Sequence, residues 1–402
     1  MKVSFKNSNN HDLIGFLELP LAQKAHNYIL MAHCFTCDKN FHGVRNISKA
    51  LTNKGFGVLR FDFTGLGESE GDFADSNFSG NVEDLIAAAN FLEREYKSPT
   101  MIIGHSLGGA AAIFAAQVLP EVTALATIGT PSSLSHVTHL LSAGLEKIKN
   151  TGEATINIGG RPFQIKKQFL EDLETKDLQK LIAGLRKSIL ILHSPQDTIV
   201  GIKNAEELYK AARHPKSFIS LDGANHLLSK REDSQYVGDL IGTWAYRYLE
   251  IPEVPQPQTT HEVVAQLEEE DKYTTYLKAG NHSFIADEPT DFGGNDYGPS
   301  PYDYLSAALA SCTSMTLQMY AKRKKWPLGI VETHVNHSKT HAEDCEHCED
   351  ANSKIDTFER AISFTGNLDE KQTERLLEIA DKCPVHKTLH QKVNIKTSYK
   401  TK

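Results

Sequence analysis

Short apolar runs alternate with amphipathic stretches along the first 250 residues of the chain. The amphipathic stretches, such as Val82–Tyr96, carry apolar residues at helical spacing. Brief β-rich runs that alternate with helices are typical of a doubly wound, mainly parallel sheet. We therefore predict an α/β fold for this part of the chain. Its predicted strands are Tyr28–Ala32, Gly57–Phe61, Met101–Ile103, Thr123–Ile128, Ser188–Leu192 and Ser217–Leu221.

An insertion interrupts this alternation. About 60 residues separate Ile128 from Ser188, many more than a connection between a helix and a strand needs. Within it, Thr138–Ile148 and Lys167–Leu185 have helical patterns, and Thr151–Ile165 is compatible with a hairpin around Gly159-Gly160. We predict a largely helical cap over residues 132–186, which would cover the carboxyl edge of the sheet and shape a pocket there.

The pattern changes after residue 250. A chain of 402 residues exceeds the size of a single hydrophobic core, and residues 251–261 are proline-rich, polar and without periodicity. We predict a linker there between two domains, residues 1–250 and 262–402. The second should be α+β, with a sheet packed on two helices. Its predicted helices are Tyr302–Lys325 and Asp369–Lys382, and its predicted strands are Tyr273–Ala279, Ile330–His337, Asp356–Phe364 and Lys392–Tyr399.

The charge and the hydropathy of the chain limit the classes of partner that we expect. The formal net charge is −8, whereas non-specific binding of nucleic acid needs basic patches that displace counterions. The first residues lack the apolar core of a signal peptide, and no apolar run is long enough to span a bilayer. We expect a cytoplasmic protein with no nucleic-acid partner, no membrane span and no cofactor.

A Gly-x-Ser-x-Gly motif links one predicted strand to an alanine-rich helix. Its residues are Gly104-His105-Ser106-Leu107-Gly108. A serine at the apex of so sharp a turn has a strained backbone, and the glycines remove side chains that would collide. The helix that follows directs N–H groups and the positive end of its dipole at the serine, which favours an oxyanion there. The motif predicts that Ser106 is a nucleophile.

A serine hydroxyl needs a histidine to take its proton and a carboxylate to orient that histidine. Asp197 and His226 each follow a predicted strand, at the edge of the sheet where α/β proteins bind ligands. Asp222 is an alternative acid, but it lies only four residues before His226 in one tight loop, and so short a separation rarely gives the required geometry. We therefore predict the triad Ser106, Asp197 and His226.

Roughly the first 250 residues resemble the α/β-hydrolase superfamily, whose triad has the same chain order. The resemblance implies a serine hydrolase that cleaves carboxylic esters of small to medium acyl chains, with thioesters and peracids as neighbouring chemistries. It also implies an oxyanion hole formed by the N–H groups of Phe35 and Leu107. Cys34 stands where relatives usually have glycine.

Residues 262–402 resemble the OsmC/Ohr superfamily through three segments: Gly298-Pro299-Ser300-Pro301-Tyr302-Asp303, Leu309-Ala310-Ser311-Cys312-Thr313 and Cys383-Pro384-Val385-His386. In that family the first cysteine attacks an organic hydroperoxide, the second resolves the sulfenic acid to a disulfide, and a dithiol reduces it. The resemblance gives these roles to Cys312 and Cys383, and it implies a homodimer. Family peroxidases activate the first cysteine with an arginine from the N-terminal strands, yet no arginine occurs between Arg247 and Arg323.

The whole chain resembles the bifunctional α/β-hydrolase/OsmC fusion proteins. Two alternatives to a primary esterase stay open: a thiol peroxidase with an accessory thioesterase, or an OsmC-like half that only dimerises.

The remaining cysteines form two C-x-x-C pairs. We expect Cys34 and Cys37 to be reduced and to pack as small residues near the active site. Cys345 and Cys348 form the second pair, in a loop. With His341 and His337 they are weak candidates for a zinc site.

Overall fold

The computed structural model describes the chain except for residues 22, 35–36, 135–141, 159–160, 253–254, 342–353 and 400–402. The chain forms two compact units, Met1–Val254 and Pro255–Lys402. The division falls inside the proline-rich segment 251–261.

The first unit is built on an eight-stranded sheet with the order β1-β2-β4-β3-β5-β6-β9-β10. β1 and β2 pair antiparallel at one edge, and from β4 to β10 every pairing is parallel. The six strands predicted from the apolar runs are all present, so the doubly wound sheet is confirmed. The strands are β1 Lys2–Lys6, β2 Asp12–Glu18, β3 Asn27–Ala32, β4 Phe56–Phe61, β5 Pro99–His105, β6 Ala124–Ile128, β9 Ser188–His193 and β10 Lys216–Ser220.

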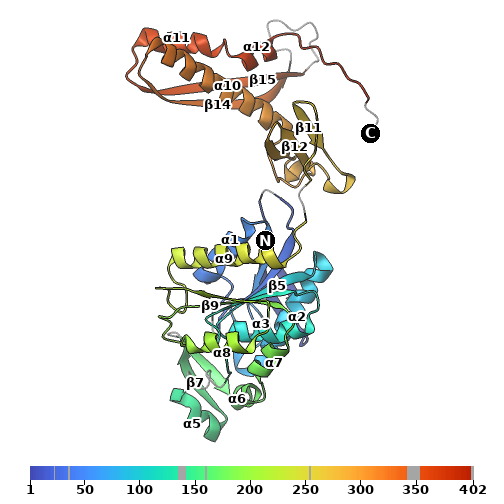
Figure 1. Ribbon diagram of the computed structural model, residues 1–402, viewed down its shortest axis with the longest axis vertical. Coiled ribbons are helices and arrows are strands. Elements are labelled where there is room, and N and C mark those ends of the chain that lie inside the picture. Colours follow the sequence, from blue (N-terminus) through green and yellow to red (C-terminus); the bar gives the residue numbers. More distant parts are fainter. Residues whose placement is uncertain are drawn as a thin grey trace. The chain divides into compact units, whose positions relative to one another are not determined.

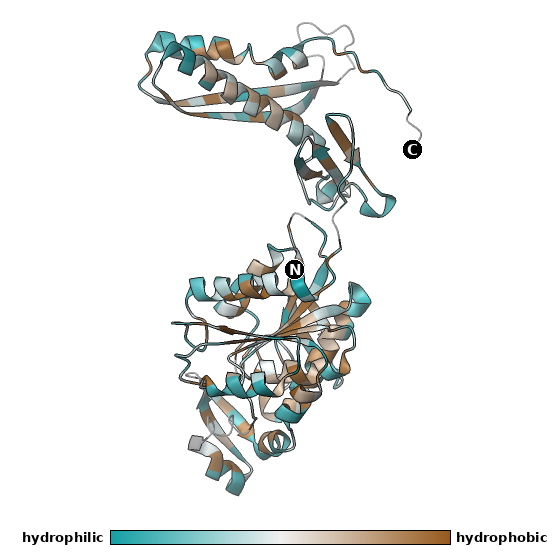
Figure 2. Ribbon diagram, in the orientation of Figure 1, coloured by the Kyte–Doolittle hydropathy of each residue, from teal (hydrophilic) through white to brown (hydrophobic). Residues whose placement is uncertain are grey.

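Helices cover both faces of this sheet (Figure 1). On one face lie α1 (His42–Thr52) and α9 (Arg231–Tyr248); on the other lie α2 (Phe78–Glu95), α3 (Leu107–Val118), α7 (Leu178–Gly184) and α8 (Lys203–Ala211). Figure 2 shows the central strands as hydrophobic and the outer helix surfaces as hydrophilic. Residues on β3, such as Ile29 and Leu30, alternate between the two cores and are fully buried. Fully burying one such side chain stabilises the fold by about 1.5–3 kcal/mol.

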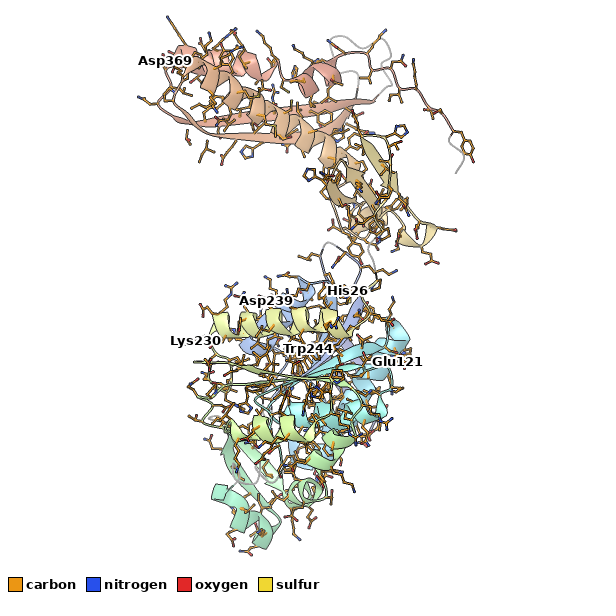
Figure 3. The ribbon with its side chains drawn as sticks, in the orientation of Figure 1. His26, Glu121, Lys230, Asp239, Trp244 and Asp369 are labelled. Atoms are coloured by element: carbon orange, nitrogen blue, oxygen red, sulfur yellow. A yellow bond between two sulfur atoms is a disulfide. The ribbon has the colours of Figure 1, made fainter. Side chains whose placement is uncertain are left out.

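The side chains on the α9 face show how that helix is held. Trp244 lies between α9 and the sheet and donates its Nε1–H to Ser217 Oγ at 3.0 Å (Figure 3). The His26 ring packs edge-on against Phe56 and against Tyr246 of α9. These contacts attach the C-terminal part of α9 to the amino-terminal ends of β10, β3 and β4.

The insertion after β6 has the predicted hairpin and helices. The hairpin pairs β7 (Glu153–Ile158) with β8 (Arg161–Lys166), and α5 (Ser142–Thr151) precedes it. The predicted helix Lys167–Leu185 is two helices, α6 (Lys167–Glu174) and α7, because Asp177 caps the second one and begins it anew. Asp172 of α6 accepts hydrogen bonds from both the N–H and the hydroxyl of Ser79. The insertion therefore contacts the start of α2, which follows the carboxyl end of β4.

The second unit contains a three-stranded antiparallel sheet and a long two-stranded hairpin. The helix α10 packs along the hairpin, and α11 and α12 pack on α10 (Figure 1). Both predicted helices are present, and each begins with a capping box, from Ser300 and from Asp369, the latter labelled in Figure 3. The elements are β11 Val263–Gln266, β12 Thr275–Ala279, β13 His282–Ala286, α10 Pro301–Lys324, β14 Leu328–His341, β15 Lys354–Gly366, α11 Glu370–Ala380 and α12 Pro384–His390.

One predicted strand of this unit is wrong. The segment Lys392–Tyr399 has no regular secondary structure, and its side chains, including Val393, Ile395 and Tyr399, are exposed. An alternating pattern makes a strand only where a neighbouring strand accepts its backbone hydrogen bonds, and no described strand pairs with this segment. In the described part of the chain, no helix is both long and apolar enough to cross a membrane.

Candidate active site

The turn between β5 and α3 places Ser106 at its apex. Ser106 has φ +55° and ψ −127°, a conformation that residues with side chains rarely adopt. The two glycines of the motif make it possible. A Cβ on Gly104 would lie 2.4 Å from the Gly109 Cα, and one on Gly108 would lie 2.3 Å from the His33 carbonyl oxygen. The turn has the geometry expected from the motif.

Ser106, His226 and Asp197 form one continuous chain of hydrogen bonds. The His226 Nε2 lies 3.0 Å from the Ser106 Oγ, and the His226 Nδ1 lies 2.6 Å from the Asp197 Oδ2. All three side chains are at least nine-tenths buried. They are 120 and 29 residues apart in sequence, and only the shared carboxyl edge of the sheet brings them together.

Backbone N–H groups hold the Asp197 carboxylate in place. Its Oδ1 accepts from Ile199 N–H at 2.8 Å and from Val200 N–H at 2.9 Å, which leaves Oδ2 for His226. Burial alone raises the pKa of this carboxyl, but the hydrogen bond and charge of His226 and the two N–H bonds outweigh it and lower the pKa. The alternative acid, Asp222, accepts instead from the Ser220 hydroxyl at 2.8 Å and is exposed.

A buried, neutral histidine, His105, lies next to the triad. His105 lies beside Ser106 in sequence, and its Nε2 lies 2.7 Å from the His226 carbonyl oxygen. Burial, followed by repulsion from His226, lowers the pKa of His105 to about 3. A neutral ring can donate its Nε2–H to that carbonyl. His105 therefore helps to position the loop that carries His226.

The predicted oxyanion hole is only partly described. Leu107 is the first residue of α3, so its N–H has no acceptor within the helix. Phe35 lies outside the described residues. Two residues precede Phe35 in this loop. His33 and Cys34 follow β3, and the His33 carbonyl oxygen closely approaches Gly108 at the start of α3. This approach is why Gly108 must be glycine.

The prediction that Cys34 and Cys37 are reduced packing residues is wrong in this structure. The two cysteines are joined in a disulfide, with their Cα atoms 5.3 Å apart. The Cys37 N–H also donates to the Cys34 carbonyl oxygen at 3.1 Å. That turn brings the two sulfur atoms together, which the C-x-x-C spacing allows but does not require.

A buried ion network anchors the far end of the same loop. Lys39 is 3% exposed; its backbone N–H and its Nζ both bond Asp62, and the Nζ also bonds Glu68 at 2.6 Å. Arg60 donates to the Lys39 carbonyl oxygen and pairs with Glu18 at 2.8 Å. The network was not predicted, because its members come from separate segments of the chain that only packing brings together.

The second unit gathers a different set of residues around Cys383. This thiol is fully buried; it accepts from the His386 N–H at 3.3 Å and lies 3.7 Å from the Thr313 Oγ. Arg360 of β15 donates to that Thr313 oxygen at 3.0 Å and pairs with Asp381 at 2.7 Å. Cys312, the neighbour of Thr313 on α10, is half-buried.

Arg360 is the residue that sequence reasoning missed. Family peroxidases carry their arginine before the first cysteine, whereas Arg360 comes from a strand that follows Cys312 and contacts its neighbour Thr313. Only the packing of the hairpin on α10 reveals this, because Thr313 and Arg360 are 47 residues apart.

The candidate zinc ligands are not brought together in the described residues. Cys345 and Cys348 lie outside those residues, as does the side chain of His341. The His337 Nε2 lies 2.8 Å from the Asp356 Oδ1, and its ring stacks on Tyr302. No group of metal-ligating side chains occurs among the residues that the structure describes.

Comparison with known proteins supports the fold assigned to each of the two domains. A family model described as OsmC-like protein matches residues 293–398, and one described as serine aminopeptidase, S33, matches residues 39–151. The esterase domain of a Rhodothermus marinus protein is 48% identical, with a TM-score of 0.52, over 62% of this chain and 98% of that domain. The chain is a fusion of an α/β-hydrolase domain and an OsmC-like domain.

Other relatives are more distant in sequence. Palmitoyl-protein thioesterase ABHD10, mitochondrial, from Mus musculus is 28% identical over 170 residues, which are 40% of this chain and 56% of that protein. The chain thus spans little more than half the length of the curated relatives it matches first. The mouse α/β hydrolase domain-containing protein 10 structure is 19% identical, with a TM-score of 0.53, over 61% of this chain and 99% of that one, and shows the shared fold.

Proposed function

We propose that the hydrolase domain cleaves carboxylic esters of small to medium acyl chains. Ser106 attacks the carbonyl carbon, while His226 takes the serine proton and later gives it to the leaving alcohol. Asp197 orients His226, and the N–H groups of Phe35 and Leu107 stabilise the oxyanion. The observation that carries this proposal is the unbroken hydrogen-bond chain from the Ser106 Oγ through His226 to Asp197.

The relatives support this choice of substrate. The similar Rhodothermus marinus domain is named an esterase, and the more distant mouse protein is named a thioesterase. Both reactions pass through a tetrahedral oxyanion on the same triad, so thioesters are the neighbouring substrate class.

A series of p-nitrophenyl esters, from acetate to dodecanoate, tests the proposal. We expect turnover that depends on chain length and is lost in Ser106→Ala. Ser220→Ala is the matched control, because Ser220 ends β10 and its hydroxyl donates to the exposed Asp222. Equal turnover by wild type and Ser106→Ala would show that the serine is not the nucleophile.

For the OsmC-like domain we propose reduction of organic hydroperoxides. The Cys312 thiolate attacks the peroxide, forms a sulfenic acid and releases an alcohol; Cys383 then displaces water to form a disulfide, which an external dithiol reduces. The observation that favours this function over a pure dimerisation module is the cation near the second cysteine. Arg360 donates to Thr313, whose hydroxyl faces the Cys383 sulfur.

Arg360→Gln tests this second function. Thr313 has one hydroxyl proton, which can go to the Leu309 carbonyl oxygen at 2.8 Å or to the Cys383 sulfur. With Arg360 donating to the same oxygen, the proton can serve a thiolate at the sulfur. We expect Arg360→Gln to slow formation of the Cys312–Cys383 disulfide by about tenfold, and Arg375→Gln, on the exposed face of α11, to leave it unchanged. If wild type consumes no hydroperoxide with a dithiol, the dimerisation module is the better account.

An exposed stripe on α10 supports the homodimer. Leu305, Met315 and Met319 are 43%, 65% and 74% exposed, and Ala308 and Cys312 fall between them at alternating spacings of three and four residues. That spacing is typical of a helix that packs against another helix. We expect light scattering to give a dimeric mass, and Met315→Glu to shift it toward the monomer; a monomeric wild type would refute the proposal. The cytoplasmic location stays a prediction.

A further inference from the structure

We propose that His193 is a positioning residue for the acid of the triad: its uncharged ring fixes the loop that carries Asp197. The inference deepens the serine-hydrolase function proposed above and rests on it. His193 is the last residue of β9, and Asp197 lies four residues later in the loop that follows. The His193 ring is completely buried, with 0% of the residue exposed.

The His193 ring holds this loop through one residue, Val200. The His193 Nε2 lies 2.7 Å from the Val200 carbonyl oxygen. The Val200 N–H donates to the Asp197 Oδ1 at 2.9 Å. Val200 therefore connects the two side chains, because its carbonyl is held by His193 and its N–H holds the carboxylate. With Oδ1 held in this way, the Asp197 Oδ2 stays 2.6 Å from the His226 Nδ1.

The acceptor decides which nitrogen of the His193 ring carries the proton. A carbonyl oxygen can only accept, so the His193 Nε2 carries a hydrogen and donates it to Val200. The Nδ1 of the neutral ring is then a bare acceptor, and it is buried without a partner among the described residues. Burial lowers the pKa of His193 and outweighs the Val200 bond and the charge of Asp197, which raise it. The ring is therefore neutral at neutral pH.

Neutrality matters because His193 also lies close to the carboxylate. Its Nε2 is 3.6 Å from the Asp197 Oδ2, the oxygen that bonds His226. A protonated ring there would compete with the His226 imidazolium for the same negative charge. A neutral ring whose N–H is taken by Val200 leaves that charge to His226. His105, the other ring packed against His226, is also neutral.

Other bonds hold the loop of His226, so the effect of His193 can be separated from them. His105 bonds the His226 carbonyl oxygen, and the Ser194 hydroxyl donates to the Ala224 carbonyl oxygen at 2.6 Å. Neither bond involves the His193 ring. Removing the donor of that ring should therefore release the carboxylate and leave the base in place.

His193→Leu and His193→Gln test the proposal in the full chain. Leucine fills a similar space but has no donor, whereas the glutamine amide can reach the place of Nε2 and donate to the Val200 carbonyl oxygen. The assay is hydrolysis of the best p-nitrophenyl ester, with active sites counted by a fluorophosphonate. We expect His193→Leu to lower kcat by about tenfold or more and to leave KM nearly unchanged, because orientation of the base acts in the transition state. His193→Gln should recover most of this loss.

The pH profile separates positioning of the acid from a general loosening of the fold. The acid limb of kcat/KM reports protonation of the base in the free enzyme. An imidazolium that the carboxylate no longer faces is less stable, so this limb should move to lower pH by about half a unit or more in His193→Leu. His26→Leu is the matched control and should keep the wild-type profile. The His26 Nε2 makes the same kind of bond, to the Lys54 carbonyl oxygen at 2.9 Å, but at the amino end of β3.

Two results would overturn the proposal: an acid limb in His193→Leu that matches wild type, or equal losses of kcat in His193→Leu and His193→Gln. If His193→Leu does not fold, His193→Asn replaces it, because its shorter amide reaches only the place of Nδ1. If wild type hydrolyses no ester, the proposed substrate class is wrong. The rate at which a fluorophosphonate labels Ser106 then gives the same comparison, and equal labelling of wild type and variant would again overturn the role of His193.

Discussion

Replacing Asp197 by asparagine tests the triad most directly. The amide oxygen of asparagine can keep the two hydrogen bonds from Ile199 and Val200 N–H, so its NH2 group would face the His226 Nδ1, now 2.6 Å from a carboxylate oxygen. An NH2 group there favours the tautomer with the proton on Nε2, which cannot accept the Ser106 proton. We expect kcat to fall about 10⁴-fold, or about 5.5 kcal/mol of transition-state stabilisation.

The assay is hydrolysis of the best p-nitrophenyl ester, with the urea unfolding midpoint measured in parallel. The midpoint should change little because the backbone hydrogen bonds persist. Asp222→Asn is the matched control, since Asp222 is exposed and its carboxylate accepts a hydrogen bond from the Ser220 hydroxyl. The reasoning fails if Asp197→Asn keeps more than about a tenth of wild-type kcat, or if Asp222→Asn loses more activity than Asp197→Asn.

Two further predictions concern stability. A Cβ on Gly108 would lie 2.3 Å from the His33 carbonyl oxygen, whereas one on Gly184 meets nothing within 4 Å. We therefore expect Gly108→Ala to lower the thermal unfolding midpoint and the activity, and Gly184→Ala to change neither. Equal unfolding midpoints for the two variants would show that the turn can relax. Below pH 6.5 the unfolded chain protonates His105, which the folded chain does not protonate until about pH 3, so acid favours unfolding. The unfolding free energy should fall by roughly 1.4 kcal/mol per pH unit from this residue between about pH 6 and pH 5, above the range where the lowered pKa values of Asp197 and Glu68 matter. Urea titrations from pH 7 to 5 should show a smaller slope for His105→Gln, and an unchanged slope would refute this account.

Much of the hydrolase fold was predictable because its signals are local. The strands β3, β4, β5, β6 and β9 are buried on both sides and therefore appear as continuous apolar runs. The Gly104-to-Gly108 motif could also be interpreted from the sequence. A side chain on Gly104 would collide with Gly109 in the same turn, and one on Gly108 would collide with the His33 carbonyl oxygen after the neighbouring strand. The α+β prediction for the second half succeeded where helices begin with capping boxes, as at Ser300 and Asp369.

Predictions failed where the decisive partner is remote or lacking. Lys392–Tyr399 alternates as a strand would, yet no described strand pairs with it. The reduced state expected for Cys34 and Cys37 was wrong, because a disulfide depends on the turn that brings the sulfur atoms together, and the C-x-x-C spacing alone does not show that turn. Arg360 and Cys383 meet only through Thr313, and no local pattern indicates such a contact.

By itself, the sequence determined the fold classes of the two domains and the sharp turn around Ser106, and it favoured Asp197 over Asp222 as the acid, because periodicity, glycine requirements and chain order act over a few neighbouring residues. Only the tertiary structure shows that Asp197 lies 2.6 Å from His226, that His105 bonds the His226 carbonyl oxygen, that Lys39 pairs with Asp62 and that Cys34 and Cys37 form a disulfide. Those choices depend on distances of about 3 Å between residues far apart in the chain, and such distances are set when the sheet and its helices pack.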